Sequence, residues 1–119
     1  MAQEQPWPRE LVFSREHKSL RIAFDNDETY EIPFELLRIE SPSAEERGHG
    51  PAHRTIGGKR NVAVTRADPV GRYAVRIVFD DGHQSGLYSW EYLRDLGRER
   101  DARMNAYLKR LDAAGLQRG

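Results

Sequence analysis

The residues of this chain best suited to chemistry are its four histidines and a few nearby carboxylates. His83 ends an Asp-Asp-Gly-His stretch, and Glu46 and His49 lie three residues apart in a glycine-rich stretch. Two imidazoles and a carboxylate are ligands that suit zinc or ferrous iron. One hypothesis is therefore a zinc or iron site formed by His83, His49 and Glu46, with His53 as a further candidate.

His83 also has a structural interpretation. Residues 80–83 have the composition of a hairpin turn, because an Asp-Gly pair supplies the positive φ angles of a type I′ turn. A histidine in such a turn most often forms hydrogen bonds with nearby carbonyl groups, and Asp80 and Asp81 would then form the turn and have no acid–base role. Both interpretations of His83 stay open on the sequence alone.

Other catalytic motifs are weak or absent. The chain has no cysteine, which excludes disulfides, thiolate metal sites and cysteine nucleophiles. Ser41 and Ser43 lie in no nucleophile-elbow motif, and the stretch Gly57–Arg60 lacks the spacing and the following helix of a phosphate-binding loop. The sequence therefore predicts no catalytic residue, and we expect the protein not to be an enzyme.

The first half of the chain is expected to form a small sheet. Apolar and polar residues alternate from about Glu10 to Ile32, with a polar connection at 15–18 and turn-forming Asp and Asn residues at 25–27. This pattern predicts a three-stranded antiparallel meander. Pro33 then ends the sheet and opens a short helix at 34–39.

The second group of strands surrounds His83. Val62–Val64 is expected to be a strand that ends before Asp68, and Tyr73–Phe79 is the strongest strand, with alternate residues on a buried face. Residues 84–88 are the return strand. Within it Gly86 indicates a bulge or a close approach by another segment.

The remainder is predicted to be helical. Ser89 is a suitable N-cap for a helix that begins at Trp90 and is interrupted at Gly97. In the stretch 98–119, Gly115 is a plausible C-terminal stop. One apolar face, which is expected to dock on the sheet or alternatively to meet a partner helix, contains Met104, Tyr107, Leu108 and Leu111.

Together these patterns predict an α+β fold of small antiparallel sheets, a meander plus a hairpin, with a short helix and a C-terminal helical segment. We expect a polar arm at 1–8, one domain at 9–97 and a C-terminal helix at 98–119. The stretch 40–61 is predicted to be a long loop inside the domain. A loop of about twenty residues is unusual in a compact domain, so it is either mobile or functional.

Composition limits the partners and the location. A chain of 119 residues fits one domain, and its 19 basic and 19 acidic residues cancel, which gives no general attraction to nucleic acid or membranes. The only feature that supports nucleic-acid binding is a local basic patch, formed by Arg54, Lys59, Arg60 and Arg66. The sequence has no apolar run of about 18–20 residues and no signal-peptide pattern. We therefore expect a cytoplasmic protein with no nucleic-acid and no membrane partner.

Two stretches carry a family resemblance: LLRIESPSAEERGHG at Leu36–Gly50 and VGRYAVRIVFDDGHQSGLYSWEYLRDLG at Val70–Gly97. They resemble the gamma-butyrobetaine hydroxylase-like N-terminal domain, which would account for residues 9–97. The family occurs as small stand-alone bacterial proteins of unassigned function. Related domains lie at the front of gamma-butyrobetaine and trimethyllysine dioxygenases and behind the P-loop scaffold of some plastid iron–sulfur assembly proteins.

The resemblance also implies a metal position. In the dioxygenases this domain holds a structural zinc through a Cys-x-Cys-x-x-Cys cluster, which follows a leucine–arginine pair, and through a distant histidine. The pair corresponds here to Leu37 and Arg38, and the four ligand positions are held by Ser41, Ser43, Glu46 and His83. Serine hydroxyls are poor zinc ligands, so the family's zinc site is not expected to be intact. The resemblance does place the loop with Glu46 and His49 near His83, which keeps a different metal site open.

Two functions follow as expectations. The favoured one is a non-catalytic protein-interaction or accessory module, linked to iron–sulfur or metallocofactor handling by the proteins in which related domains occur. The alternative is a small metal-binding protein or metal-dependent enzyme that uses His83 with Glu46 and His49. A protein partner is expected to meet the long loop, Trp90, Arg94 and the C-terminal helix.

Overall fold

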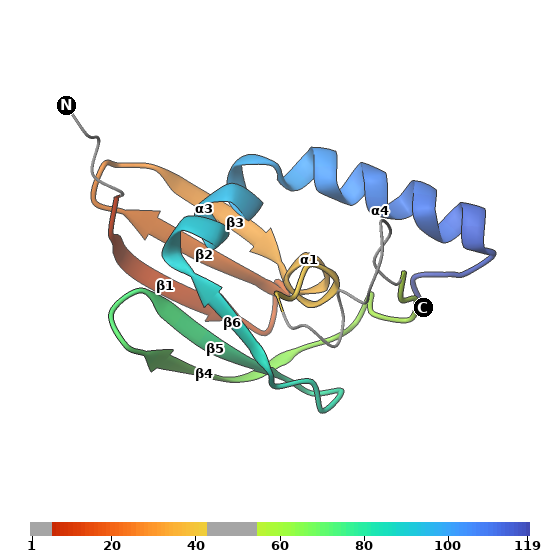
Figure 1. The fold of residues 1–119 in the computed structure, drawn as a ribbon, viewed down its shortest axis with the longest axis horizontal. Helices are drawn as coiled ribbons and strands as arrows, with labels where there is room; N and C mark the ends of the chain where they lie inside the picture. The colour runs from red at the N-terminus through yellow and green to blue at the C-terminus, as the bar shows by residue number, and fades with distance from the viewer. Residues whose placement is uncertain (1–5, 43–54) are drawn as a thin grey trace.

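The computed structural model describes residues 6–42 and 55–119, which form two small antiparallel sheets and three helices (Figure 1). The elements follow in the order β1 (Pro8–Ser14), β2 (Ser19–Phe24), β3 (Thr29–Pro33), α1 (Phe34–Ile39), β4 (Val64–Val70), β5 (Ala74–Phe79), β6 (Gly86–Ser89), α3 (Trp90–Arg98) and α4 (Arg100–Ala114). This confirms the predicted α+β class. In the same two ranges, no helix combines the length and the apolar character needed to cross a membrane.

The predicted meander is the first sheet, in which β1, β2 and β3 pair in sequence order. Its central strand β2 supplies Leu20, Ile22 and Phe24 to the core, and all three side chains are fully buried. At the turn between β2 and β3, Asp27 has a left-handed φ of 72° and Asn26 accepts a hydrogen bond from the Glu28 backbone at 3.0 Å. The turn residues therefore act as the sequence predicts.

The second sheet has three strands, because β4 pairs with β5 and extends the predicted hairpin. The prediction that the first of these strands ends before Asp68 is wrong, since β4 continues to Val70 and pairs Pro69 with Val75. β4 lies at the edge of its sheet, and a strand with one open side tolerates a proline. Pro69 suggested that the strand would end, but the edge position of β4 allows the strand to continue through it.

Strand β5 has the predicted alternation: Val75, Ile77 and Phe79 are buried in the core. Tyr73 does not share this face. It lies in the turn before β5 and its side chain is 67% exposed.

Helix α1 connects the two sheets at the centre of the molecule, where Figure 1 shows it end-on. All six of its residues are buried. Its C-terminal carbonyls are satisfied by two tyrosines of the second half of the chain: the Tyr88 hydroxyl donates to the Leu37 oxygen and the Tyr92 hydroxyl donates to the Glu40 oxygen, each at 2.5 Å. Because such carbonyls have no partner within a helix, these two bonds fix its end in place.

Helix α3 begins as predicted, with the Ser89 side chain accepting a hydrogen bond from the Tyr92 backbone at 3.0 Å. Gly97 does not interrupt it, because α3 continues to Arg98. A Cβ atom at Gly97 would lie 2.5 Å from both Cβ and Cγ of Tyr30 on β3. The glycine therefore lets the helix lie directly against the first sheet.

Helix α4 docks on its own chain, where Tyr107 and Leu111 join the core shared by both sheets. The helix lies beside α1 and α3 and not across a sheet face, and the Tyr107 hydroxyl donates to the Ile56 oxygen at 2.7 Å. Gly115 ends the helix in the left-handed conformation, as predicted, with a φ of 70°. Leu108, on the flank of the predicted stripe, is exposed.

Candidate functional site

The turn that carries His83 is a three-residue loop between β5 and the chain that leads to β6. The Phe79 backbone donates to the His83 oxygen at 2.9 Å, the Gly82 backbone donates to the Phe79 oxygen at 3.1 Å, and Gly82 has a φ of 92°. Asp81 does not have a positive φ angle. The type I′ prediction is therefore wrong, because the loop has three residues and needs a left-handed conformation only at its glycine.

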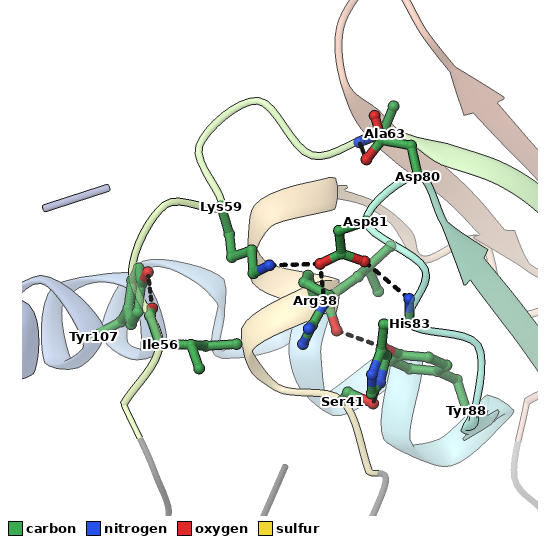
Figure 2. A network of polar contacts seen from close by, with 11 residues as sticks. Arg38, Ser41, Ile56, Lys59, Ala63, Asp80, Asp81, His83, Tyr88 and Tyr107 are labelled. Atoms are coloured by element: carbon green, nitrogen blue, oxygen red, sulfur yellow. Dashed lines mark hydrogen bonds and ion pairs between the residues drawn. The ribbon is translucent and has the colours of Figure 1, made fainter. Parts of the chain in front are cut away.

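Asp81 is the centre of the polar network in Figure 2. Its Oδ2 atom accepts from Arg38 Nε at 2.7 Å and from Lys59 Nζ at 2.6 Å, and its Oδ1 atom accepts from the His83 backbone at 3.0 Å. These partners come from α1, from the segment before β4 and from the turn itself. One carboxylate therefore joins three parts of the chain that are distant in sequence.

The surroundings of Asp81 strongly favour its ionised, negatively charged form. Burial alone would raise its pKa, but the hydrogen bonds from Lys59, from the His83 backbone and from Arg38 outweigh that effect and lower the pKa to about 2. The side chain of Arg38 is only 7% exposed, so it has lost most of its contact with water. Interactions within the protein must replace that hydration. At neutral pH the group is a charge-assisted clamp in which Arg38 is buried and Asp81 still contacts solvent.

His83 contacts the end of α1 through its ring. Ser41 Oγ and His83 Nε2 lie 2.8 Å apart, and both residues are buried. A Cβ atom at Gly86 would lie 2.7 Å from Ser41 Oγ, so the predicted close approach at this glycine is confirmed. We define the polar cluster as the five residues Arg38, Ser41, Lys59, Asp81 and His83.

A hydroxyl beside an imidazole is also the arrangement that activates a serine nucleophile. Ser41 is only 3% exposed, however, and the glycine contact closes one side of its hydroxyl. A substrate carbonyl would have to reach an oxygen that the fold covers. The arrangement suits a structural hydrogen bond better than acyl transfer.

Tyr88 lies next to the polar cluster and supports the same end of α1. Its side chain is fully buried, and this burial raises the pKa of its phenol well above the usual range. The hydroxyl therefore stays protonated and serves as a donor to Leu37. It belongs to the scaffold of the site.

The structure describes one of the three predicted metal ligands, His83. His83 lies beside Ser41, so two of the four positions implied by the family resemblance meet in space. Glu46, His49, Ser43 and His53 lie outside the described residues. Over 6–42 and 55–119, no group of three His, Cys, Asp or Glu side chains is arranged to hold a metal ion. A neutral hydroxyl and one imidazole do not by themselves fit zinc.

Two members of the cluster have roles that the sequence did not indicate. The sequence indicated Arg38 only as a family marker, and Lys59 only as part of a rejected phosphate loop and of a local basic patch, yet both bind Asp81. Lysine 59 is separated from Asp81 by 22 residues, and no local spacing could reveal the contact.

Two residues expected to meet a partner are engaged within the chain. Trp90 Nε1 donates to the Arg72 oxygen at 2.7 Å, and Arg94 forms a two-pronged ion pair with Glu28 at 2.7 and 2.8 Å. The Arg94 guanidinium helps to lower the pKa of the Glu28 carboxyl to about 2. Both contacts attach α3 to neighbouring turns.

Comparison with known proteins gives a consistent result. The family model for gamma-butyrobetaine hydroxylase-like, N-terminal, matches residues 11–94, and no curated protein matches the chain. Two proteins solved by NMR in solution are similar: one is 42% identical with a TM-score of 0.84, covering 99% of this chain and 90% of the other, and one is 38% identical with a TM-score of 0.83, covering 97% and 91%.

A third similar structure is a crystal structure of a protein of unknown function of the DUF971 family from Acidithiobacillus ferrooxidans. It is 34% identical with a TM-score of 0.65, and the match covers 76% of this chain and 91% of the other. The family match over residues 11–94 contains the second sheet, the first sheet except the start of β1, α1, the first half of α3 and all members of the polar cluster. The chain belongs to the gamma-butyrobetaine hydroxylase-like N-terminal domain family.

Proposed function

We propose that this protein is a non-catalytic interaction module whose polar cluster is an internal clamp. The observation that supports a partner surface is an exposed aromatic patch, which we define as Trp7 and Tyr73. Trp7 is 45% exposed and Tyr73 is 67% exposed, and their ring centroids lie 5.6 Å apart. Tryptophan and tyrosine are enriched among the residues that dominate binding energy in protein interfaces.

The patch is held in position before any partner binds. The Trp7 backbone donates to the Asp25 side chain at 3.2 Å, and the Asp25 backbone donates to the Trp7 oxygen at 2.8 Å. Tyr73 is fixed from the other side, because its oxygen accepts from the Trp90 backbone at 2.9 Å. Aromatic anchors that are already ordered lose little conformational entropy on binding, which favours affinity.

The partner that fits this patch is a protein with an apolar surface or pocket. We further propose that it belongs to the machinery that handles iron–sulfur clusters or other metallocofactors. This part of the proposal is supported by the proteins in which related domains occur. The clamp around Asp81 would keep the scaffold rigid and would not itself contact the partner.

The patch can be tested with full-length variants. In cells of the source organism, cross-linking capture of the wild type and of Tyr73→Ala should identify a partner that only the wild type retains. With that partner purified, we expect Tyr73→Ala to weaken its Kd by about tenfold or more, since a central aromatic contributes about 1.4 kcal/mol or more.

The matched control is Val12→Ala, which removes an exposed apolar side chain from the first sheet. It should change the Kd less than about twofold, as is usual for residues outside the energetic centre of an interface. Equal binding by wild type, Tyr73→Ala and Trp7→Ala would contradict the patch as the interface. A partner unrelated to metal cofactors would contradict only the proposed pathway.

The alternative function, metal binding at His83, is favoured by one observation: Ser41 and His83, which hold two of the four ligand positions implied by the family resemblance, lie 2.8 Å apart. If this alternative is right, protein purified without a metal-affinity tag will contain zinc or iron near one equivalent, and His83→Ala will lose it. His17→Ala is the control, because His17 lies exposed in the turn between β1 and β2 and should leave the metal content unchanged. Metal well below one equivalent, with no change in His83→Ala, would rule the alternative out.

A further inference from the structure

After α4 the chain turns back on itself. We call Leu116–Gly119 the return segment. It runs beside the segment Gly57–Arg60, at the end of the molecule opposite the turn between β4 and β5 (Figure 1). The Gly58 backbone donates to the Gln117 oxygen at 2.8 Å, and the Arg60 backbone donates to the Arg118 oxygen at 2.9 Å. The contact thus consists of two backbone hydrogen bonds between segments that are distant in sequence, and neither segment is a β-strand.

Arg118 holds the return segment in place through an ion pair with a buried carboxylate. Its Nη2 and Nε atoms lie 2.6 and 3.1 Å from the two oxygens of Glu35, which is only 5% exposed. The Glu35 hydrogen bond raises the pKa of Arg118 above its usual value. A paired fork of this kind is specific for a guanidinium and is poorly reproduced by lysine.

The opposing backbone is shaped for this approach. A Cβ atom at Gly57 would lie 2.6 Å from the Gln117 oxygen, so a larger residue would push the return segment away. Leu116 is exposed and contributes little apolar burial. The return segment is therefore held by two backbone hydrogen bonds and one guanidinium, and not by a hydrophobic anchor.

We propose that Glu35 and Gly57–Arg60 form a recognition site for an extended segment that carries an arginine, and that the return segment occupies this site in cis. The contacts require only features that such a segment has: two consecutive backbone carbonyl oxygens, and a guanidinium on the second of these two residues. A partner segment of the same chemistry can replace the return segment. The site is separate from the aromatic patch and does not depend on it.

Occupation of the site is coupled to the polar cluster. Lys59 lies between the two donors of the site, Gly58 and Arg60, and its ammonium binds Asp81. Release of the return segment frees the backbone on both sides of Lys59. A partner that exchanges with the return segment would thus act on the same segment that helps to hold the turn of His83.

The test uses the full chain with Arg118→Ala, which empties the guanidinium position at an exposed end of the chain. The probe is the peptide acetyl-Leu-Gln-Arg-Gly-amide, titrated to millimolar concentrations while the backbone amides of Gly58 and Arg60 are followed by NMR. We expect saturable shifts of both amides in Arg118→Ala. In the wild type, about tenfold more peptide or more should be needed to reach half of the maximal shift, because its own return segment competes at a high effective concentration.

Two controls make the result specific. The peptide acetyl-Leu-Gln-Ala-Gly-amide should bind Arg118→Ala at least about tenfold more weakly, as expected for loss of a charge-assisted pair. In the double variant Glu35→Gln with Arg118→Ala, the two peptides should bind alike. Unchanged amide shifts of Leu20 and Ile22 show that each variant keeps its fold. No saturable shift in Arg118→Ala, or equal binding of the two peptides there, would overturn the proposal.

Discussion

Replacement of Asp81 by alanine is expected to lower the free energy of unfolding by about 2 kcal/mol, between the values for exposed and for buried ion pairs, because Arg38 is buried and Asp81 still contacts solvent. The carboxylate is the shared acceptor of Arg38 and Lys59, and the Arg38 side chain is almost completely buried. Its removal takes this shared acceptor away from both cations, which lie close together. Urea unfolding at pH 7, followed by tryptophan fluorescence, measures the loss.

Asp80→Asn is the matched control for this prediction, because Asp80 lies next to Asp81 in the same turn. Its Oδ1 atom accepts from the Ala63 backbone at 3.1 Å, and an asparagine oxygen can accept the same bond. We expect a change below about 0.5 kcal/mol, the usual range for a surface substitution. Equal losses for the two variants would show that the turn tolerates neither change and that the cations are not the cause.

The contribution of Asp81 should also depend on pH. Its folded pKa is about 2, below the value of about 3.9 for an unfolded aspartate. The stabilisation is therefore fully present above about pH 5 and is lost as the pH falls toward 2. The difference in unfolding free energy between wild type and Asp81→Ala should shrink over that interval, and a difference that stays constant from pH 5 to 2.5 would contradict the ion-pair explanation.

The second large effect is expected from Gly97→Ala. Helix propensity alone predicts that this change stabilises α3 by about 1 kcal/mol. The new Cβ would lie 2.5 Å from Tyr30 Cβ and Cγ, and neither a Cβ nor the base of a tyrosine can rotate away. Overpacking of about 3 kcal/mol then gives a net loss of about 2 kcal/mol. Thermal or urea unfolding measures it.

The sign of this change separates the two explanations. A stabilised Gly97→Ala variant would show that α3 is free to shift from the first sheet, and a destabilised one shows that the close approach to Tyr30 is required. Arg98→Ala, one residue further along on the exposed side of the same helix, is the control and should stay within about 0.5 kcal/mol of wild type.

The fold was predictable where local pattern and tertiary context agree. The alternation in β2 and β5, the Ser89 cap and the Gly115 stop are local signals that tertiary packing confirms. Prediction failed where packing overrides a local rule. Pro69 is accommodated by an edge strand, and Gly97 sits inside a helix because a tyrosine on another element leaves no room for a side chain.

The site was predictable only through His83. The family resemblance and the turn composition both indicated this histidine, and the structure places it against Ser41, a position that the same resemblance indicates. The charged members could not be derived, because Arg38 and Lys59 reach Asp81 from 43 and 22 residues away. A single sequence carries no signal for pairs at such separations.

The tyrosine bonds at the end of α1 also bear on the order in which the chain can fold. A helix of six residues is too short to be stable alone, and the hydroxyls that close it come from Tyr88 and Tyr92, 51 and 52 residues later in the chain. During synthesis the β1–β3 meander can therefore form early, whereas α1 becomes ordered only after Tyr92 has left the ribosome. Loop closure over such distances is slow, so we expect this helix, at the centre of the molecule, to be among the last elements to form.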